Sequence, residues 1–453
     1  MIRFLRILAV AALLDAGLDS AHAQGIVRLT DDRAVVPASA SMGSNGGQVF
    51  MTGEAPQPDP AYLEPAPAPP DAPWSIWQPR FLEEHRIKTG GWIQQGITFN
   101  AWNPKDRFNG PITTNDRHSE YMLNQLWLYF DRPTQTDGEG FDLGGRVDLV
   151  YGEDWRFGQN VGLEDRINSP NNFYGLVLPQ FYLEVAYNDL TVKMGHFATF
   201  TSLELIPAPL NFFYSRSYLM VGYLDPLLVT GLQADYKLNN GWTLVGGFNR
   251  GWMLFENPFG DTLNFLGGLR WASEDKRSSI STMVSTGPTM TFTGYRDVTS
   301  VFFVVSHQFT ERFWSGTQIT VGGEPGGSAI TPGDNDAWYG FEQMFTYKLN
   351  PKWSTGLRYE WIQNNEGSRV AGIGNILGSN RGWAGKPGYA GSFSELSLGL
   401  NYRPHPNFTL RPEVRWDWFN GPLNPNDPAY PLPFGDGQHS SQFTTGLDLL
   451  VTY

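Results

Sequence analysis

Charged residues alternate with apolar ones in three segments of the chain, and this spacing is the first sign of a chemical task. Residues two apart in a strand point to the same face, so each segment would carry its charges on one face. Charges of both signs around a narrow aqueous passage create a transverse field that favours small polar solutes. For any one residue, an ordinary solvated side chain is the alternative. The positions are Asp142, Arg146, Asp148, Arg358, Glu360, Arg411, Glu413, Arg415 and Asp417.

A second candidate site is the segment 198–225, ATFTSLELIPAPLNFFYSRSYLMVGYLD, which is apolar and aromatic where a connection is usually polar. Such a segment is poorly suited to water and should pack against the rest of the protein. If it folds into a barrel, its polar side chains would narrow the passage, whereas a lid packed at the outer rim is the alternative. The candidate constriction residues are Glu204, Asn211, Tyr214, Ser215 and Arg216.

Other reactive combinations are weak in this sequence. The chain has no cysteine, which excludes disulfides, zinc–thiolate sites and thiol catalysis. The seven histidines show no HxxxH or HExxH spacing, and Asp334-Asn335-Asp336 lacks the rest of a calcium-loop pattern. His307 follows Ser306, but adjacent residues of a strand point to opposite faces. We therefore expect no metal, no cofactor and no enzyme activity.

The charge balance narrows the partners. The net charge is −13 at pH 7, and no cluster of Lys and Arg is present to meet phosphates. This excludes nucleic acid as a partner. An acidic passage would instead give a mild preference for cations.

The N-terminal 80 residues are typical of an exported protein with a linker. Arg3 and Arg6 precede an apolar stretch from Ile7 to Leu14, and Ala21-His22-Ala23 offers a small-x-small cleavage site. We expect a signal peptide over residues 1–23, in which the region before the cleavage site departs from the usual pattern. Residues 24–80 are rich in Pro and show no sustained period, which predicts a disordered periplasmic segment.

From about residue 81 to 453 the sequence repeats one pattern of about ten alternating residues, a short turn, another such strand and a long polar loop. Seven short connections contain Asn, Asp, Gly or Pro, which suit tight hairpins. They lie at 131–138, 188–189, 239–241, 273–276, 310–311, 350–352 and 403–406. Eight longer loops lie near 102–120, 152–173, 198–225, 254–261, 287–297, 323–336, 364–389 and 419–440. Seven turns and eight loops join sixteen strands, the layout of an all-β, antiparallel, up-and-down transmembrane barrel. The apolar segment 198–225 is the third long loop in this count.

The last strand carries a further signal. Apolar residues alternate toward the chain end, and the chain stops on an aromatic residue. This arrangement resembles the C-terminal signal that the bacterial barrel-assembly machinery reads. The residues concerned are Gly446, Leu449, Val451 and Tyr453.

Four stretches resemble the β-barrel porin family of the porin-2 type. They are VKMGHF (192–197), IPAPLNFFYSRSY (206–218), VTGLQADYKL (229–238) and GWTLVGGFNRGW (241–252). The resemblance covers about 81–453 and implies an outer-membrane location and passive transport of small hydrophilic solutes. In sixteen-stranded porins the third long loop folds inward, and such porins are commonly homotrimers in outer-membrane lipid. A substrate-selective channel and a non-conducting barrel whose loops bind a partner remain alternatives.

Overall fold

The computed structural model describes residues 73–169, 172–219, 223–258, 260, 262–291, 294–370, 388–421 and 432–453. The predicted signal peptide and residues 24–72 of the predicted linker lie outside them. Nearly all the described residues belong to one antiparallel sheet and its connections. Its strands are β1 (Lys88–Asn100), β2 (Tyr121–Arg132), β3 (Phe141–Gly152), β4 (Gly175–Val177), β5 (Phe181–Tyr187), β6 (Leu190–Ala198), β7 (Leu228–Lys237), β8 (Trp242–Trp252), β9 (Asn264–Ala272), β10 (Ser278–Thr291), β11 (Gly294–Gln308), β12 (Phe313–Glu324), β13 (Asp336–Asn350), β14 (Trp353–Asn364), β15 (Gly391–His405), β16 (Phe408–Asn420) and β17 (Ser441–Thr452).

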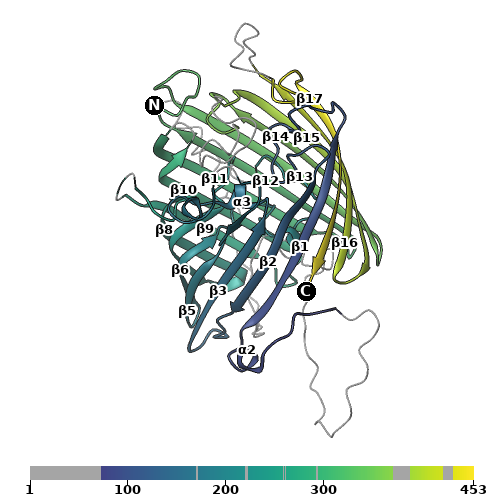
Figure 1. The fold of residues 1–453 in the computed structure, drawn as a ribbon. Coiled ribbons are helices and arrows are strands. Elements are labelled where there is room, and N and C mark those ends of the chain that lie inside the picture. The colour runs from purple at the N-terminus through teal and green to yellow at the C-terminus, as the bar shows by residue number, and fades with distance from the viewer. Residues whose placement is uncertain are drawn as a thin grey trace. The chain divides into compact units, whose positions relative to one another are not determined.

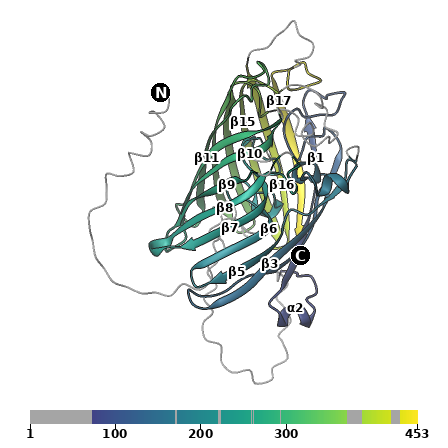
Figure 2. The same cartoon turned by 90° about the vertical axis from the view of Figure 1, so that its left-hand side faces the viewer.

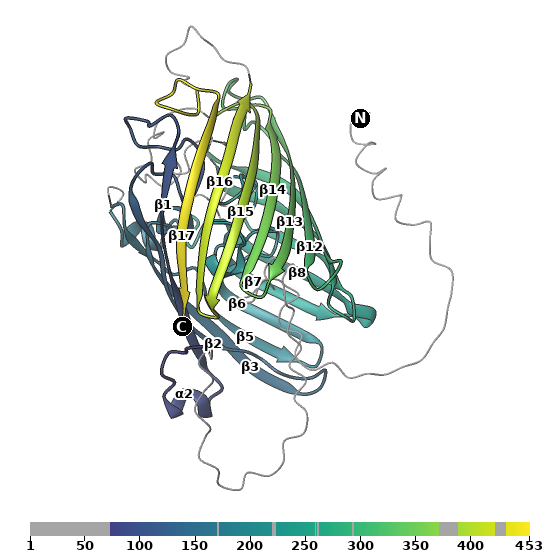
Figure 3. The same ribbon diagram turned by 90° about the vertical axis from the view of Figure 1, so that its right-hand side faces the viewer.

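The sheet closes on itself because β1 pairs with both β2 and β17. Figure 3 shows β17 between β16 and β1, and Figures 1 and 2 show the wall from β5 to β12. At the seam, the backbone of Gly91 exchanges two hydrogen bonds of 3.0 Å with Tyr453. The Tyr453 hydroxyl also donates to the Trp127 carbonyl at 2.9 Å. Closure pairs the backbone N–H and C=O groups of the edge strands with each other, as a barrel in a membrane requires.

The barrel is sixteen-stranded, as the sequence predicts, because β4 and β5 form one interrupted strand. Both pair with β3, β4 at its Val150–Gly152 end and β5 along Phe141–Val147. Pro179 lies in the gap and cannot donate to a ladder. The ladder is nevertheless bridged there, since the Asp148 N–H donates to the Gln180 carbonyl at 2.7 Å.

The two faces of the wall differ as the alternation predicts. On β3, Phe141 and Leu143 are 62% and 53% exposed on the outer face, whereas Asp148 is buried on the inner one. Strand β17 repeats the pattern, with Phe443 and Leu447 outward and Gly446 inward. An apolar outer face with aromatic residues is suited to lipid contact. Among the described helices, none has the length and apolar character needed to span a bilayer.

One predicted loop is wrong. Residues 287–291 and 294–297 belong to β10 and β11, which stay paired up to Thr291 and Gly294. Pro288 has no N–H to donate to a neighbouring strand, but β10 pairs with β9 only as far as Thr286. Beyond that point β10 is an edge strand on the β9 side, where a proline is tolerated. The turn predicted at 403–406 also begins later, because β15 runs to His405.

The described residues before β1 line the rim at the C-terminal end of the barrel, where α2 (Arg80–Glu84) lies (Figure 1). The Trp74 N–H donates to Asn407 Oδ1 at 2.6 Å, and Gln78 donates to the Thr89 hydroxyl at 2.8 Å. Arg86 then forms an ion pair of 2.7 Å with Asp142 of β3. This segment therefore contacts the β15–β16 turn, β1 and β3.

Candidate functional site

The connection between β6 and β7, residues 199–227, is called loop 3 here, and it packs inside the barrel. All five predicted constriction residues lie in it and are buried. Asn211 holds the loop's own turn, donating to the Leu205 carbonyl at 2.6 Å and accepting from the Leu205 N–H at 2.9 Å. The short helix η3 (Ala208–Leu210) precedes it, following Pro207. The loop is thus a structured insert.

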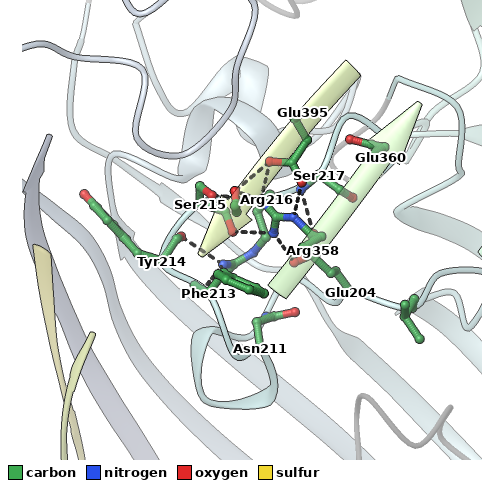
Figure 4. Close-up of polar contacts among 12 residues, drawn as sticks. Glu204, Asn211, Phe213, Tyr214, Ser215, Arg216, Ser217, Arg358, Glu360 and Glu395 are labelled. Carbon is green, nitrogen blue, oxygen red and sulfur yellow. Dashed lines mark hydrogen bonds and ion pairs between the residues drawn. The ribbon is translucent and has the colours of Figure 1, made fainter. Parts of the chain in front are cut away.

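Arg358 of β14 is the centre of the contact between loop 3 and the wall (Figure 4). Its guanidinium forms ion pairs with Glu204 of loop 3 at 2.5 Å and Glu395 of β15 at 2.6 Å. It also donates to the Ser215 carbonyl at 3.1 Å and to the Ser215 hydroxyl at 2.8 Å. An arginine is suited to this position because its planar head carries five donors.

The other predicted charges of β14 and β16 also meet loop 3. Glu360 accepts from the Leu219 N–H at 2.5 Å, and Glu413 accepts from the Tyr214 N–H at 2.9 Å. Arg411 donates to the Asn211 carbonyl at 2.9 Å.

Arg415 completes this set. It donates to the Arg216 carbonyl at 2.5 Å and pairs with Asp417 at 2.7 Å. All six predicted charges of β14 and β16 face inward, but they are buried and serve as the seat of loop 3.

The three predicted charges on β3 are placed differently. Asp142 is bound at the rim by Arg86 and Arg132. Arg146 pairs with the buried Asp148 at 2.8 Å and remains 22% exposed. These residues lie apart from loop 3's seat, so the structure divides the predicted charges into two groups.

Inward-facing glycines are functional residues that our sequence reasoning missed. A Cβ on Gly356 would lie 2.5 Å from Phe212, and one on Gly399 would lie 3.0 Å from Phe213. A Cβ on Gly96 of β1 would lie 2.7 Å from the Tyr214 ring. These positions leave room for the aromatic residues of loop 3. For Gly356 and Gly399 the signal was available, because they alternate in register with the inward charges Arg358 and Glu395.

Gly446 belongs to the same group. A Cβ there would lie 3.1 Å from Tyr214, so its small size has a use inside the barrel. Leu449, Val451 and Tyr453 follow it along β17 and at the chain end, and all three are partly exposed.

Among the described residues, a large apolar cluster inside the barrel joins several long loops to the wall. It joins Ile112 of the first long loop, Phe157 of the second, Leu219 and Leu224 of loop 3 and Phe434 of the eighth. Strand residues such as Trp252, Trp338 and Phe393 complete it. Several connections therefore pack together inside the wall.

Arg156 of α3 (Trp155–Gly158) ties the first two long loops together. Its guanidinium binds both oxygens of Asp116, at 2.8 and 3.0 Å, and also pairs with Glu153. All three groups are buried. In the second of these loops, burial raises the pKa of Glu164 to about 7.

Replacing Arg156 by Met should loosen the first two loops without opening the wall. Removing one partner of a buried ion pair typically costs about 3–5 kcal/mol. We expect faster hydrogen exchange of residues 109–118 and 153–168, measured by mass spectrometry, with the strands unchanged. Arg107→Met, at an exposed salt bridge of the same loop, is the matched control. Unaltered exchange in Arg156→Met would contradict this role.

A closed sixteen-stranded barrel with an apolar outer face and an inward-folded third loop defines an outer-membrane channel of the porin class. The chain belongs to the family described as putative beta-barrel porin-2, OmpL-like, whose model matches residues 86–453. No curated protein matches the chain.

Solved structures agree with this fold. OmpT of Vibrio cholerae, an outer membrane protein solved in a trimer form, is 12% identical, with 81% of this chain and 99% of that chain covered and a TM-score of 0.50. The anion-selective porin from Comamonas acidovorans is 9% identical, with the same coverage and TM-score. OprB of Pseudomonas putida is 14% identical over 83% of this chain and 96% of its own, with a TM-score of 0.48. At these identities the likeness to the first two structures concerns the fold alone.

Proposed function

We propose that this porin lets small hydrophilic solutes and ions diffuse passively across the outer membrane, through a lumen that loop 3 constricts. The observation that supports this most directly is the anchoring of loop 3 by Arg358 to Glu204 and Glu395 inside the barrel. Fixed charges at a constriction select solutes by size and charge.

The luminal charges that remain in contact with water indicate where solutes would travel. Asp131, Arg146 and Asp235 are between 22% and 27% exposed, whereas the charges that seat loop 3 are fully buried. We propose that the aqueous route follows the β2–β7 wall. Glu204, Asn211, Tyr214, Ser215 and Arg216 would then act by shaping loop 3 rather than by touching the solute.

The test is single-channel conductance of the refolded full-length chain in a planar bilayer with a salt gradient. We expect stepwise, ohmic currents and a reversal potential showing mild cation preference, because carboxylates outnumber basic groups in the chain. A reversal potential of the opposite sign would contradict the cation preference. A folded barrel that never conducts would contradict the porin assignment.

The apolar cluster favours a second candidate, a barrel whose external loops bind a partner and which does not conduct. Apolar residues from the first, second, third and eighth long loops meet inside the wall, where a permanently open channel would hold water. The conductance measurement separates the two candidates.

The remaining partners follow from the porin assignment. We propose a homotrimer embedded in outer-membrane lipid, which mass measurement of the detergent-solubilised protein would test. We further propose that Gly446, Leu449, Val451 and Tyr453 contribute to recognition by the barrel-assembly machinery. We propose no catalytic role, since Ser306 Oγ bonds Ser279 Oγ at 2.8 Å, away from the outward-facing His307.

A further inference from the structure

Four carboxylates stand side by side on adjacent strands beneath loop 3. In the strand register, Glu342 of β13 lies opposite Glu360 of β14, Glu360 opposite Glu395 of β15, and Glu395 opposite Asp417 of β16. All four are fully buried on the inner face. Like charges directly opposite each other destabilise a sheet, so this acidic row needs compensation.

The cations around the acidic row are too few to compensate it. Two further carboxylates lie beside the acidic row, those of Glu204 of loop 3 and Glu413 of β16. Three guanidiniums lie among these groups, from Arg216, Arg358 and Arg415. Arg411, the fourth guanidinium that holds loop 3, is paired with Asp448 of β17. The six carboxylates named above thus face three guanidiniums among buried side chains.

Most members of the row nevertheless have partners. Glu395 pairs with Arg358 and Arg415, and Glu360 accepts backbone N–H groups of loop 3. Asp417 accepts from Arg415 at 2.8 Å and from the Tyr218 hydroxyl at 2.8 Å.

Glu342 is the exception. Among the described residues, neither of its carboxyl oxygens has a hydrogen-bond partner. The groups that face it are Glu204 of loop 3, Glu360 and Arg358 of β14, Glu395 of β15, and the neutral Gln318 opposite it on β12. The nearest charges are therefore mainly negative, and an ionised carboxylate there would be buried without compensation.

Asp225 is a second buried carboxyl group of this kind, at the end of loop 3. It accepts from Ser202 at 2.6 Å, from Gln318 at 2.5 Å and from Thr320 at 3.2 Å. These three donors are uncharged. Burial raises the pKa of Asp225 to about 7, since these hydrogen bonds only partly offset the lost hydration. The Asp225 carboxyl joins both ends of loop 3 to β12.

We propose that loop 3 is a proton-linked gate, seated against β12–β16 while Glu342 and Asp225 carry protons and released when they ionise. An ionised carboxylate buried without a cation costs several kcal/mol, and release into water removes that cost. The seated state binds more protons than the released state, so rising pH shifts the equilibrium toward release. Each linked proton contributes up to about tenfold per pH unit. This inference rests on the proposed channel, which the gate would open at higher pH.

The test follows loop 3 directly, without requiring conduction. Ala208 of loop 3 is fully buried, and the native chain has no cysteine, so Ala208→Cys gives one thiol that a water-soluble maleimide reaches only after release. Labelling rates of the folded full-length chain are measured from pH 5 to 9. They are normalised to Ser75→Cys, an exposed thiol that corrects for the intrinsic pH dependence of the reaction.

In the Ala208→Cys protein with native Glu342 and Asp225, the normalised labelling rate should rise by up to about a hundredfold per pH unit. This is the limit for two linked protons. Glu342→Gln or Asp225→Asn should each reduce the slope to about tenfold or less. The double variant should label slowly at every pH. Glu274→Gln, at an exposed turn, is the control and should behave as the unmodified chain.

A flat pH profile in the unmodified chain, or a full slope in the double variant, would overturn the gate. Conductance recorded on the same proteins separates the gate from the proposed function. A labelling slope in a barrel that never conducts supports the gate and contradicts the porin assignment. Ohmic currents with a flat labelling profile support the porin assignment and overturn the gate.

Discussion

Replacing Arg358 by Met should release loop 3 and raise the single-channel conductance. The substitution keeps the length of the side chain but leaves Glu204 and Glu395 buried without their shared cation. Breaking a buried ion pair costs about 3–5 kcal/mol, which corresponds to roughly 150-fold or more in the seating equilibrium. Maleimide labelling of Ala208→Cys measures that equilibrium, and planar-bilayer recordings measure the conductance.

Two further variants make the Arg358 result specific. Arg312→Met removes an exposed arginine from the β11–β12 turn and should leave labelling and conductance unchanged. Adding Glu204→Gln to Arg358→Met removes one of the stranded charges and should restore part of the seating. Labelling of Arg358→Met at the rate of the unmodified chain would show that this network does not hold loop 3.

Replacing Gly356 by Leu should displace loop 3 by steric overlap, with no change in charge. The new Cβ would lie 2.5 Å from the ring of Phe212, which packs in a cluster with Phe213, Trp314 and Met344. Overpacking of this kind costs about 1–3 kcal/mol, or roughly 5- to 150-fold in the seating equilibrium. Faster labelling of Ala208→Cys and a larger, noisier conductance are expected.

Gly246→Leu is the matched control for this prediction. Gly246 also lies within a strand, but a Cβ there meets nothing within 4 Å. It should therefore leave loop 3 in place. Equal labelling of the two glycine variants would mean that the fit between Gly356 and Phe212 does not position the loop.

The barrel could be predicted from sequence because its information is local. Alternation along β3 and β17 gives one apolar and one polar face without reference to any distant residue. Turn residues such as Asn188 and Asn240 adopt positive φ, which their side chains tolerate. The error at 287–297 arose because the cost of Pro288 depends on whether β9 still pairs with β10 there.

The residues of the candidate site could be predicted from the sequence, but the contacts that they make could not. Alternation assigns Arg358, Glu360 and Arg415 to the inner face, and in the structure all three are buried against loop 3 or its neighbours. Whether an inward charge meets water or loop 3 depends on contacts between residues 140 or more positions apart, such as Arg358 with Ser215. No local pattern encodes such a contact.

The sequence by itself determined the closed barrel, its inner and outer faces and the unusual composition of loop 3, because periodicity and turn chemistry act over a few residues. Only the tertiary structure decided that the inward charges seat loop 3, that inward glycines admit its aromatic side chains, and that Glu342 has no hydrogen-bond partner among the described residues. Those facts depend on which strands lie side by side and on how the loop fills the space between them. The register of β13–β16 brings four carboxylates into one row, and that register is fixed by the closed sheet as a whole.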